Sequence, residues 1–282
     1  MNLRPSSPAS GSGARDAAIT AEREETKYLV DHAELPALLR AITAELEPHR
    51  FTGEAANLLP GAQHFITTIY FDTPSLSYLA AAKANQHSHL KVRAKEYYDL
   101  HPALAELATD PEQILRYQPW LWFELKRREG AVTHKRRFRL LKAAAASLFD
   151  DQRAPRALPE DENERTDAEA LIAHVREQTE PVAASALVNY QRLSFQNLPS
   201  TLRVTVDLGL AFFPVPTELF RRPRALSRSE LGKPAGSERR AVVEVKRRAP
   251  LPRWLEQALA QAAGGPVNFS KFVAASEAVH GR

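Results

Sequence analysis

The sequence contains no cysteine in 282 residues. Disulfide frameworks, thiolate zinc sites and cysteine nucleophiles are therefore excluded, and a reducing, cytoplasmic location is expected. The sequence also lacks an apolar run long enough to span a bilayer, and its N-terminus lacks the basic and then apolar segments of a signal peptide. We therefore expect a cytoplasmic protein without a membrane span.

Large hydrophobic residues are scarce in the first 20 positions, which are rich in serine, glycine and proline. We expect a disordered tail over residues 1–20, followed by a single domain over residues 21–282 that can bury one substantial core. The sequence contains 38 Lys and Arg residues against 34 Asp and Glu residues, and the acidic residues are concentrated between positions 160 and 169. The other segments are therefore more basic than the total indicates, which suits an anionic partner.

Alternation of apolar and polar residues with period two predicts most of the secondary structure. The candidate strands cover residues 23–30, 65–71, 89–98, 121–128, 132–141, 186–196, 201–212 and 240–248. Eight such strands are typical of a closed barrel. The sequence therefore predicts an α+β fold, in which an antiparallel, eight-stranded closed β-barrel carries helices packed on its outside.

Apolar residues at three-and-four spacing predict the helices. The predicted helices lie between Asp31 and Pro48, over Thr166–Gln178, after Pro252 and after Ser270. Asp31 and Ser270 are expected to serve as N-caps. Asp72 is interpreted as the cap of a turn. Residues 214–237 have no periodicity, so a mobile loop is predicted there.

Six of the predicted strands carry one strongly charged face. Side chains at positions i and i+2 of a strand point to the same side, so Lys91, Arg93 and Lys95 share one face. The same spacing groups Glu25 with Lys27; Glu124 with Lys126 and Arg128; Lys135 with Arg137 and Arg139; Arg203 with Thr205 and Asp207; and Glu244 with Lys246 and Arg248. Cations predominate on these faces.

Two arrangements are compatible with the charged faces. In the first, the apolar face of the sheet packs on a core and the charged face meets water, as in many antiparallel sheets. In the second, helices cover the apolar outside of a barrel and the cations point inward. Like charges on neighbouring strands repel, and buried unpaired charge is costly, so an inward cationic face requires water or a polyanion. A chain of phosphates fits best, because Arg and Lys both pair with phosphate oxygens.

Three glutamates lie among these cations and have two interpretations. Magnesium binds through one or two carboxylates together with substrate phosphates and water, so Glu25, Glu124 and Glu244 could hold a metal beside a polyphosphate. Simple pairing with neighbouring lysines explains each glutamate equally well.

Nucleic-acid binding is an alternative for a basic sheet, and Tyr97 and Tyr98 beside a basic strand are compatible with it. A nucleic-acid interface would interleave aromatic residues with the cations on one exposed face. Phe123 and Phe138 instead lie opposite the charges, so no nucleic acid is expected as a partner.

The order of nine short segments resembles that of the VTC-type polyphosphate polymerase domain, a branch of the CYTH-like triphosphate tunnel metalloenzymes. These segments are Glu22–Tyr28, Thr68–Thr73, Leu90–Arg93, Phe123–Lys126, Lys135–Phe138, Tyr190–Arg192, Leu202–Asp207, Val243–Lys246 and Phe269–Phe272. The resemblance extends from about residue 21 to residue 275.

The resemblance implies a tunnel barrel that holds a triphosphate with Mg²⁺ or Mn²⁺ and synthesises polyphosphate from ATP with release of ADP. ATP, triphosphate or polyphosphate would be the partners, and export of the product would require a separate membrane partner. The catalytic cations implied are Arg93, Arg137, Arg192, Arg203 and Lys246. The other phosphate-binding residues implied are Lys27, Lys91, Lys126, Lys135 and Lys271. Glu244 would be the principal metal ligand, aided by Glu124 or Glu25.

The sequence departs from the pattern of the broader superfamily in three places. Arg23 stands where the first glutamate of a Glu-x-Glu-x-Lys motif is common, which favours the VTC branch. Lys91 stands where an arginine is more usual, and residues 99–119 lengthen a connection. Two further functions remain open, an inorganic triphosphatase in which water attacks, and a non-catalytic sensor of polyphosphate or nucleotide.

Overall fold

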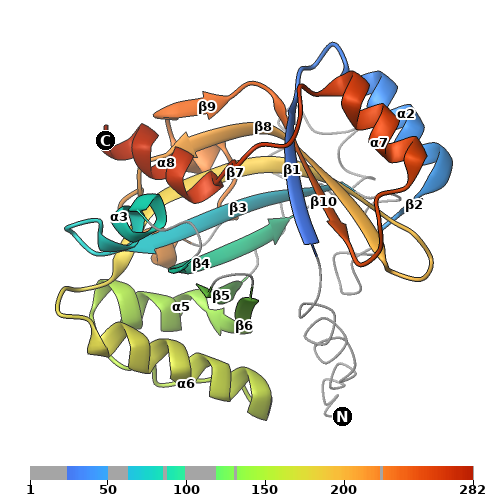
Figure 1. The fold of residues 1–282 in the computed structure, drawn as a ribbon. Coiled ribbons are helices and arrows are strands. Elements are labelled where there is room, and N and C mark those ends of the chain that lie inside the picture. Colours follow the sequence, from blue (N-terminus) through green and yellow to red (C-terminus); the bar gives the residue numbers. More distant parts are fainter. Residues whose placement is uncertain are drawn as a thin grey trace, which may run out of the picture.

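One antiparallel sheet organises the molecule (Figure 1). The computed structural model describes residues 24–49, 63–84, 88–98, 119–129, 132–222 and 225–281. In spatial order the sheet contains β1 (Glu24–Val30), β10 (Ala241–Arg247), β8 (Leu202–Phe213), β7 (Ala183–Gln196), β3 (Gln63–Asp72), β4 (Ser88–Tyr98), β5 (Trp120–Glu129) and β6 (Val132–Leu141). Two short strands extend it, β2 (Glu47–Pro48) on β7 and β9 (Gly236–Glu238) on β8. These eight long strands are the ones predicted, and their observed limits differ by a few residues at most.

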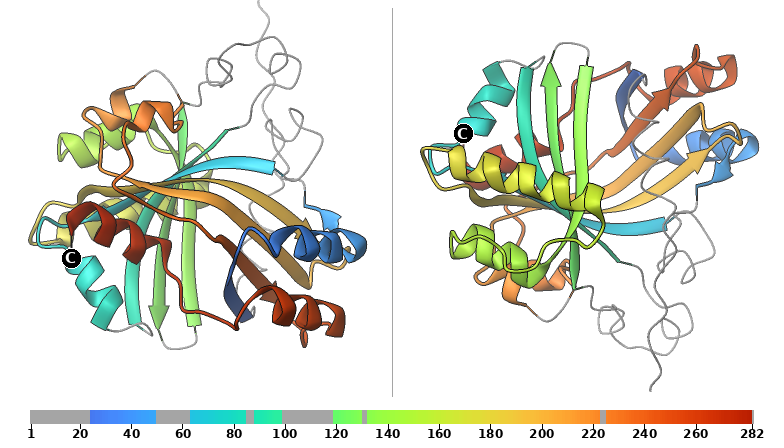
Figure 2. Two further views of the ribbon diagram at one scale, coloured as in Figure 1. Left: turned by 90° about the horizontal axis from the view of Figure 1, so that it is seen from above. Right: turned by 90° about the horizontal axis from the view of Figure 1, so that it is seen from below.

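The sheet is open, and this corrects the prediction of a closed barrel. Among the described residues no pairing joins the two edge strands, β1 and β6. The sheet instead twists and curls, so that β1 and β4–β6 lie on the same side of the central strands (Figure 2). Lys126 on β5 lowers the pKa of Glu25 on β1, so charged side chains from the two arms face each other across the concave side. Alternation along each strand is the same in an open and a closed sheet, and therefore could not predict the closure.

Two apolar layers cover the convex side of the sheet. Helices α2 (Leu35–Glu45) and α7 (Arg253–Ala262) cover β1, β10 and β8, where Leu38, Val243 and Leu255 belong to one core. Helix α5 (Lys142–Ala145), the π-helical turn η3 (Ala146–Asp150) and helix α6 (Glu162–Glu177) lie along the other arm. The core of that arm contains four phenylalanine rings in mutual contact, those of Phe71, Phe123, Phe138 and Phe149. The predicted placement of helices outside the sheet is confirmed for α2, α6 and α7.

Two helices lie on the concave side, and one of them, the helix after Ser270, was predicted to lie on the outside. Helix α3 (Ser77–Ala84) contacts β4, and helix α8 (Lys271–His280) contacts α3, β7 and β8. The ring of Phe272 on α8 lies 5.2 Å from that of Tyr70 on β3, so α8 closes one end of the concave side. The cap predicted at Ser270 is confirmed, because its side chain accepts a hydrogen bond from Val273 N. Asp72 caps α3 by accepting from Thr73 N, Tyr78 N and Leu79 N.

Helix boundaries required two corrections. Asp31 was predicted as an N-cap, but a turn follows it and α2 begins at Leu35, with Pro36 in its first turn. Helix α6 begins four residues before the predicted Thr166, because Asp161 accepts a hydrogen bond from Glu164 N and so provides the cap. Pro252 begins α7 as predicted.

The predicted mobile loop over residues 214–237 is largely ordered where the structure describes it, so that prediction was wrong. It contains two 3₁₀ turns, η4 (Leu219–Arg221) and η5 (Ser229–Leu231), as well as β9. Phe220 and Leu226 are buried in the core of the second arm. Leu226 N also donates to Glu96 Oε2 at 3.0 Å, and Lys142 Nζ pairs with Glu96 Oε1 at 2.9 Å. Buried apolar residues hold this segment against the core, but they are not regularly spaced in the sequence. The sequence therefore resembles that of a loop.

Some predictions fall outside the described residues, namely the tail over 1–20 and the lengthened connection over 99–119. None of the helices in the described part of the chain is long and apolar enough to cross a membrane.

Candidate functional site

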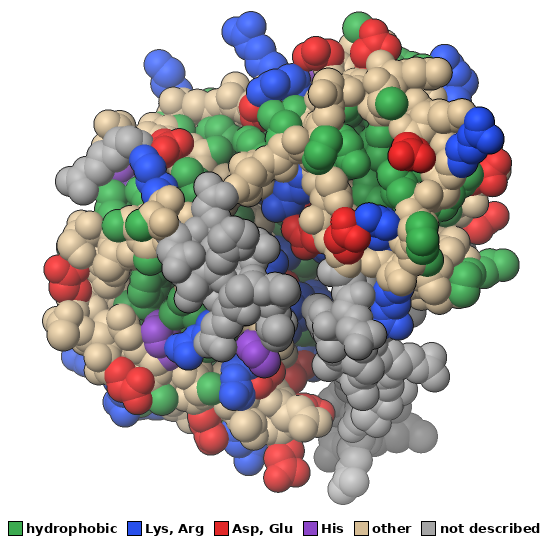
Figure 3. All heavy atoms as spheres, viewed as in Figure 1, with side chains coloured by type: hydrophobic (Ala, Val, Ile, Leu, Met, Phe, Trp, Pro, Cys, Tyr) green, Lys and Arg blue, Asp and Glu red, His purple; other side chains and the backbone are tan. Residues whose placement is uncertain are grey.

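The charged faces of the strands meet on the concave side of the curled sheet. Their register forms rows across neighbouring strands: Lys91, Lys126 and Lys135 are direct neighbours on β4, β5 and β6. Arg93, Glu124 and Arg137 form the next row. Figure 3 shows cationic and anionic side chains together in a recess beside β1. The concave side also receives the other candidates predicted from sequence, Glu25, Lys27, Arg192, Arg203, Glu244, Lys246 and Lys271.

Glu124 is enclosed by four cations in one arm of the site. Its carboxylate accepts from Arg93 Nε at 2.6 Å, lies 3.3 Å from Lys95 Nζ and 3.1 Å from Lys135 Nζ, and faces Arg137 Nε at 3.9 Å. The side chain is only 1% exposed. Burial alone would raise the pKa of Glu124, but these four cations hold it well below its ordinary value. Glu124 is therefore an ionised counter-ion at the centre of a cationic cluster.

A second acidic group occupies the facing arm. Glu244 on β10 and Glu25 on β1 share Lys246, whose Nζ lies 2.5 Å from Glu244 Oε1 and 3.9 Å from Glu25 Oε2. Lys27 Nζ lies 3.3 Å from Glu25 Oε1. The Glu244 carboxylate and burial raise the pKa of Glu25, but Lys246, Lys27 and Lys126 outweigh them and lower it. Burial also raises the pKa of Glu244, yet the surrounding cations hold it well below its ordinary value. Both carboxylates are thus ionised and close together.

Asp207 connects the sheet to α8. Arg192 binds its carboxylate through two hydrogen bonds, of 2.5 Å from Nε and 2.7 Å from Nη2, and Lys271 Nζ lies 2.6 Å from Asp207 Oδ2. Tyr190 lies beneath both cations, with its ring centre 5.5 Å from Arg192 Cζ and 5.2 Å from Lys271 Nζ. At the same end, Lys91 Nζ donates to Ser270 Oγ at 3.2 Å. The first turn of α8 therefore brings two groups into the site.

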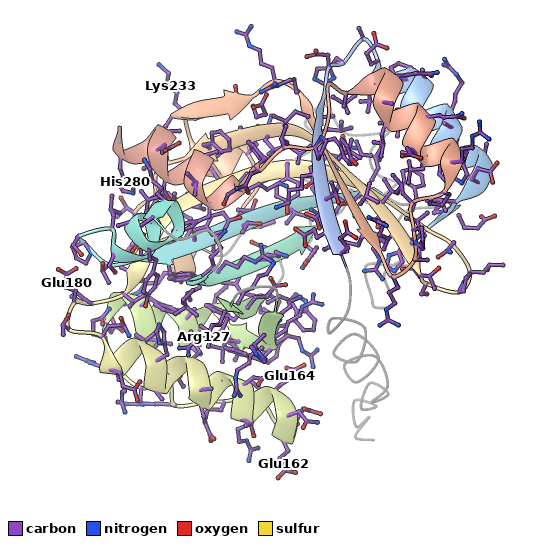
Figure 4. All side chains as sticks on the ribbon, in the orientation of Figure 1. Arg127, Glu162, Glu164, Glu180, Lys233 and His280 are labelled. Carbon is purple, nitrogen blue, oxygen red and sulfur yellow. The ribbon has the colours of Figure 1, made fainter. Side chains whose placement is uncertain are left out.

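Two of the predicted cations also contact uncharged groups. Arg203 donates from Nε to Gln196 Oε1 at 2.8 Å, and its Nη2 lies 3.1 Å from His49 Nε2. The guanidinium of Arg137 stacks 4.1 Å from the ring centre of Trp122. Arg139 shares that face by alternation, but it is 46% exposed and pairs with Glu164 of α6, whose position Figure 4 labels.

Sequence reasoning missed two polar groups that the fold adds to the site. Lys95 is buried against Glu124. Its position on the same face of the strand as Lys91 and Arg93 is a signal that could have identified it. Ser270 carried only the signal of a helix cap, which does not indicate that Lys91 would lie against it.

A family model described as the VTC domain matches residues 22–280 of the sequence. The chain belongs to the VTC domain family. The match covers every described strand and helix that contributes to the concave site. No curated protein matches the sequence.

Solved structures similar to this VTC domain share little of its sequence. A candidate adenylyl cyclase from Hippeastrum, described as having a dominant triphosphatase activity, is 12% identical with a TM-score of 0.48, and the match covers 92% of this chain and 96% of that one. A candidate adenylate cyclase from Bacillus halodurans is 13% identical with a TM-score of 0.45, covering 90% and 97%. The PH1819 protein of Pyrococcus horikoshii is 9% identical with a TM-score of 0.40, covering 90% and 96%. Similarity at this level assigns no activity to the VTC domain.

A divalent metal fits the pair of Glu25 and Glu244 better than it fits Glu124. The described residues include no cluster of three or more His, Asp or Glu side chains suited to a metal ion. Magnesium usually takes one or two carboxylates and completes its coordination with phosphates and water, which is what Glu25 and Glu244 offer. Glu124 already has four cations within 4 Å, whereas the ion pairs of Glu25 and Glu244 involve only Lys27 and Lys246, so repulsion of a further positive ion is stronger at Glu124.

Proposed function

We propose that this VTC domain synthesises polyphosphate from ATP on the concave side of its sheet. In this reaction a terminal oxygen of a polyphosphate chain attacks the γ-phosphorus of ATP, and the bond between that phosphorus and the oxygen bridging to the β-phosphorus breaks. ADP leaves with the bonding electrons, and the chain is longer by one phosphate. Phosphoryl transfer of this kind requires positioning and charge neutralisation more than a protein nucleophile.

The row of Lys91, Lys126 and Lys135 is the observation that carries this proposal. Three like charges in direct register across adjacent strands repel one another. Among the described residues, neither Lys91 nor Lys126 forms an ion pair with a carboxylate, and burial together with the nearby cations lowers the pKa of both. A polyanion lying across the row would remove the repulsion. A chain of phosphates supplies that charge in the required linear form.

The other cations receive roles by their position. Arg93, Arg137 and Lys246 border the lysine row and are proposed to bind the phosphates that react. Arg192 and Lys271 are proposed to bind phosphates at the end of the concave side next to α8, and Arg203 is proposed to bind them at the opposite margin. Glu244, with Glu25 beside it, is proposed to hold Mg²⁺ or Mn²⁺, which when bound would neutralise charge developing on the phosphates. Glu124 is proposed to keep the cationic cluster in place.

One assay tests the proposal directly. Purified protein is incubated with ATP and Mn²⁺ or Mg²⁺, and the products are separated by length. We expect polymer with an equivalent release of ADP. Free phosphate without polymer would instead identify a triphosphatase, and unchanged ATP bound to the protein would identify a sensor.

Lys91 gives the site a pH dependence that an arginine would not. Burial, followed by the nearby Lys27, Lys126 and Arg93, lowers the pKa of Lys91 to about 7 from its ordinary 10.5. Lys91 is therefore charged below that pH and becomes neutral above it, so its contribution to triphosphate binding should decline between pH 6 and 8. Lys91→Arg should remove this part of the decline, because arginine stays charged. Calorimetric titration of both proteins with triphosphate at each pH measures the effect, and parallel pH profiles would contradict it.

A further inference from the structure

Two hydroxyl groups extend the row that contains Glu244. Thr205 on β8 is the direct neighbour of Glu244 on β10, and Ser194 on β7 is the direct neighbour of Thr205. Residues that alternate with them, such as Val204 and Phe195, lie in the convex core with α2 and α7. Ser194 and Thr205 therefore point to the concave side, between the carboxylate of Glu244 and the interior of the site.

Both hydroxyl groups are buried without a partner. Ser194 is 0% exposed and Thr205 is 4% exposed. Neither hydroxyl oxygen has a hydrogen-bond partner in the part of the chain that the structure describes. Most buried polar side-chain atoms in folded proteins are hydrogen-bonded, and leaving one unsatisfied destabilises the fold. Two such groups side by side, next to Glu244, indicate that a ligand supplies the partners.

We propose that Thr205, supported by Ser194, donates a hydrogen bond to a phosphate oxygen of the substrate beside Glu244. This inference rests on the proposed function and adds an uncharged contact to it. The two hydroxyls can donate hydrogen bonds to a phosphate oxygen without adding positive charge. They would therefore bind the phosphate and leave the negative charge of Glu244 unpaired by them. Hydrogen bonds from a neutral donor to a charged oxygen are among the stronger ones in proteins.

Thr205→Val tests this inference because valine has nearly the shape of threonine and lacks the hydroxyl. We expect triphosphate to bind the variant about tenfold to a hundredfold more weakly, measured by calorimetry in EDTA so that no metal takes part. We also expect the ligand-free variant to melt at the same or a higher temperature, because an unsatisfied buried group has been removed. Thr205→Ser, which keeps the hydroxyl, should bind nearly as the wild-type protein does.

Thr67→Val is the matched control. Thr67 is also a buried strand threonine, but its hydroxyl donates to Leu226 O and accepts from Asn189 Nδ2 at 3.0 Å. This variant should lose stability and keep its affinity for triphosphate. A drop in melting temperature for ligand-free Thr205→Val, like that of the control, would show a structural hydroxyl and overturn the inference.

The remaining outcomes separate this inference from the proposed function. Absence of triphosphate binding by the wild-type protein overturns both. Normal wild-type binding with equal binding by Thr205→Val overturns the phosphate contact alone. Weaker Mn²⁺ binding by Thr205→Val, with its triphosphate affinity in EDTA unchanged, also overturns that contact and assigns the hydroxyl to the surroundings of the metal.

Discussion

Glu124→Gln is expected to lower the free energy of unfolding by about 3–5 kcal/mol, the range found when one partner of a buried ion pair is removed. Glutamine keeps the size of the side chain, but it takes away the negative charge that pairs with Lys95 and Lys135. The buried ammonium group of Lys95 then loses its compensating charge. Urea denaturation followed by circular dichroism measures the change.

Glu277→Gln provides the comparison. Its carboxylate pairs with Lys83 at 2.9 Å on the surface, where the two side chains are 41% and 46% exposed. Exposed pairs of this kind contribute about 0–1 kcal/mol. Equal losses in the two variants would contradict a central role for Glu124. Added triphosphate should restore more stability to Glu124→Gln than it adds to the wild-type protein, because phosphate oxygens can take the place of the lost carboxylate.

The same cluster sets the acid limit of stability. The folded-state pKa of Glu124 lies well below its ordinary value of 4.5. Its contribution is therefore fully present above that ordinary value and is lost as the pH falls through the lower, folded-state pKa. Glu124→Gln should remove this part of the acid dependence, so the two proteins should become more similar in stability as the pH falls.

Glu244→Gln is expected to reduce turnover by roughly a hundredfold or more, the scale seen when an electrostatic partner of a transition state is removed. Triphosphate binding should be retained, because a negative charge is taken away from a site that binds a polyanion. Titration with Mn²⁺ should show weaker metal binding, which distinguishes loss of a ligand from loss of a counter-ion to Lys246. Product analysis after incubation with ATP gives the turnover.

Glu169→Gln is a suitable control, since Glu169 is exposed on α6 and lies outside the proposed site. Its turnover and metal binding should match those of the wild-type protein. Near-normal, metal-dependent turnover by Glu244→Gln would refute its role as principal ligand. The assignment would then move to Glu25.

The strands of this fold could be predicted because alternation is a local property. Lys91, Arg93 and Lys95 against Val92 and Ala94 identify β4 and both of its faces without reference to any other segment. Helix α3 was missed because Ser77–Ala84 is short, rich in alanine and weakly amphipathic. The open sheet was missed because closure depends on how the strands curl together.

The residues that face the concave side could be predicted from the sequence, but the way they pair with one another could not. Alternation along the strands predicted that Arg93 and Glu124 point to the same side of the sheet. Only the register of β4 with β5 shows that they are partners. Arg192 and Asp207 likewise become partners through the register of β7 with β8. Ser194 and Thr205 carry no distinguishing signal, because hydroxyl residues are common in strands and their lack of partners is a property of the packed structure.

The pairing of β1 with β10 has a consequence for synthesis of the chain on the ribosome. Lys27 Nζ donates to Phe269 O across 242 positions, and β10 is the neighbour of β1 in the sheet. At ordinary rates of translation, on the order of ten seconds or more separate the appearance of these segments. During that interval β1 remains an unpaired strand, and the lysines of β4, β5 and β6 are present without Glu244. The concave site is thus among the last features of the fold to assemble.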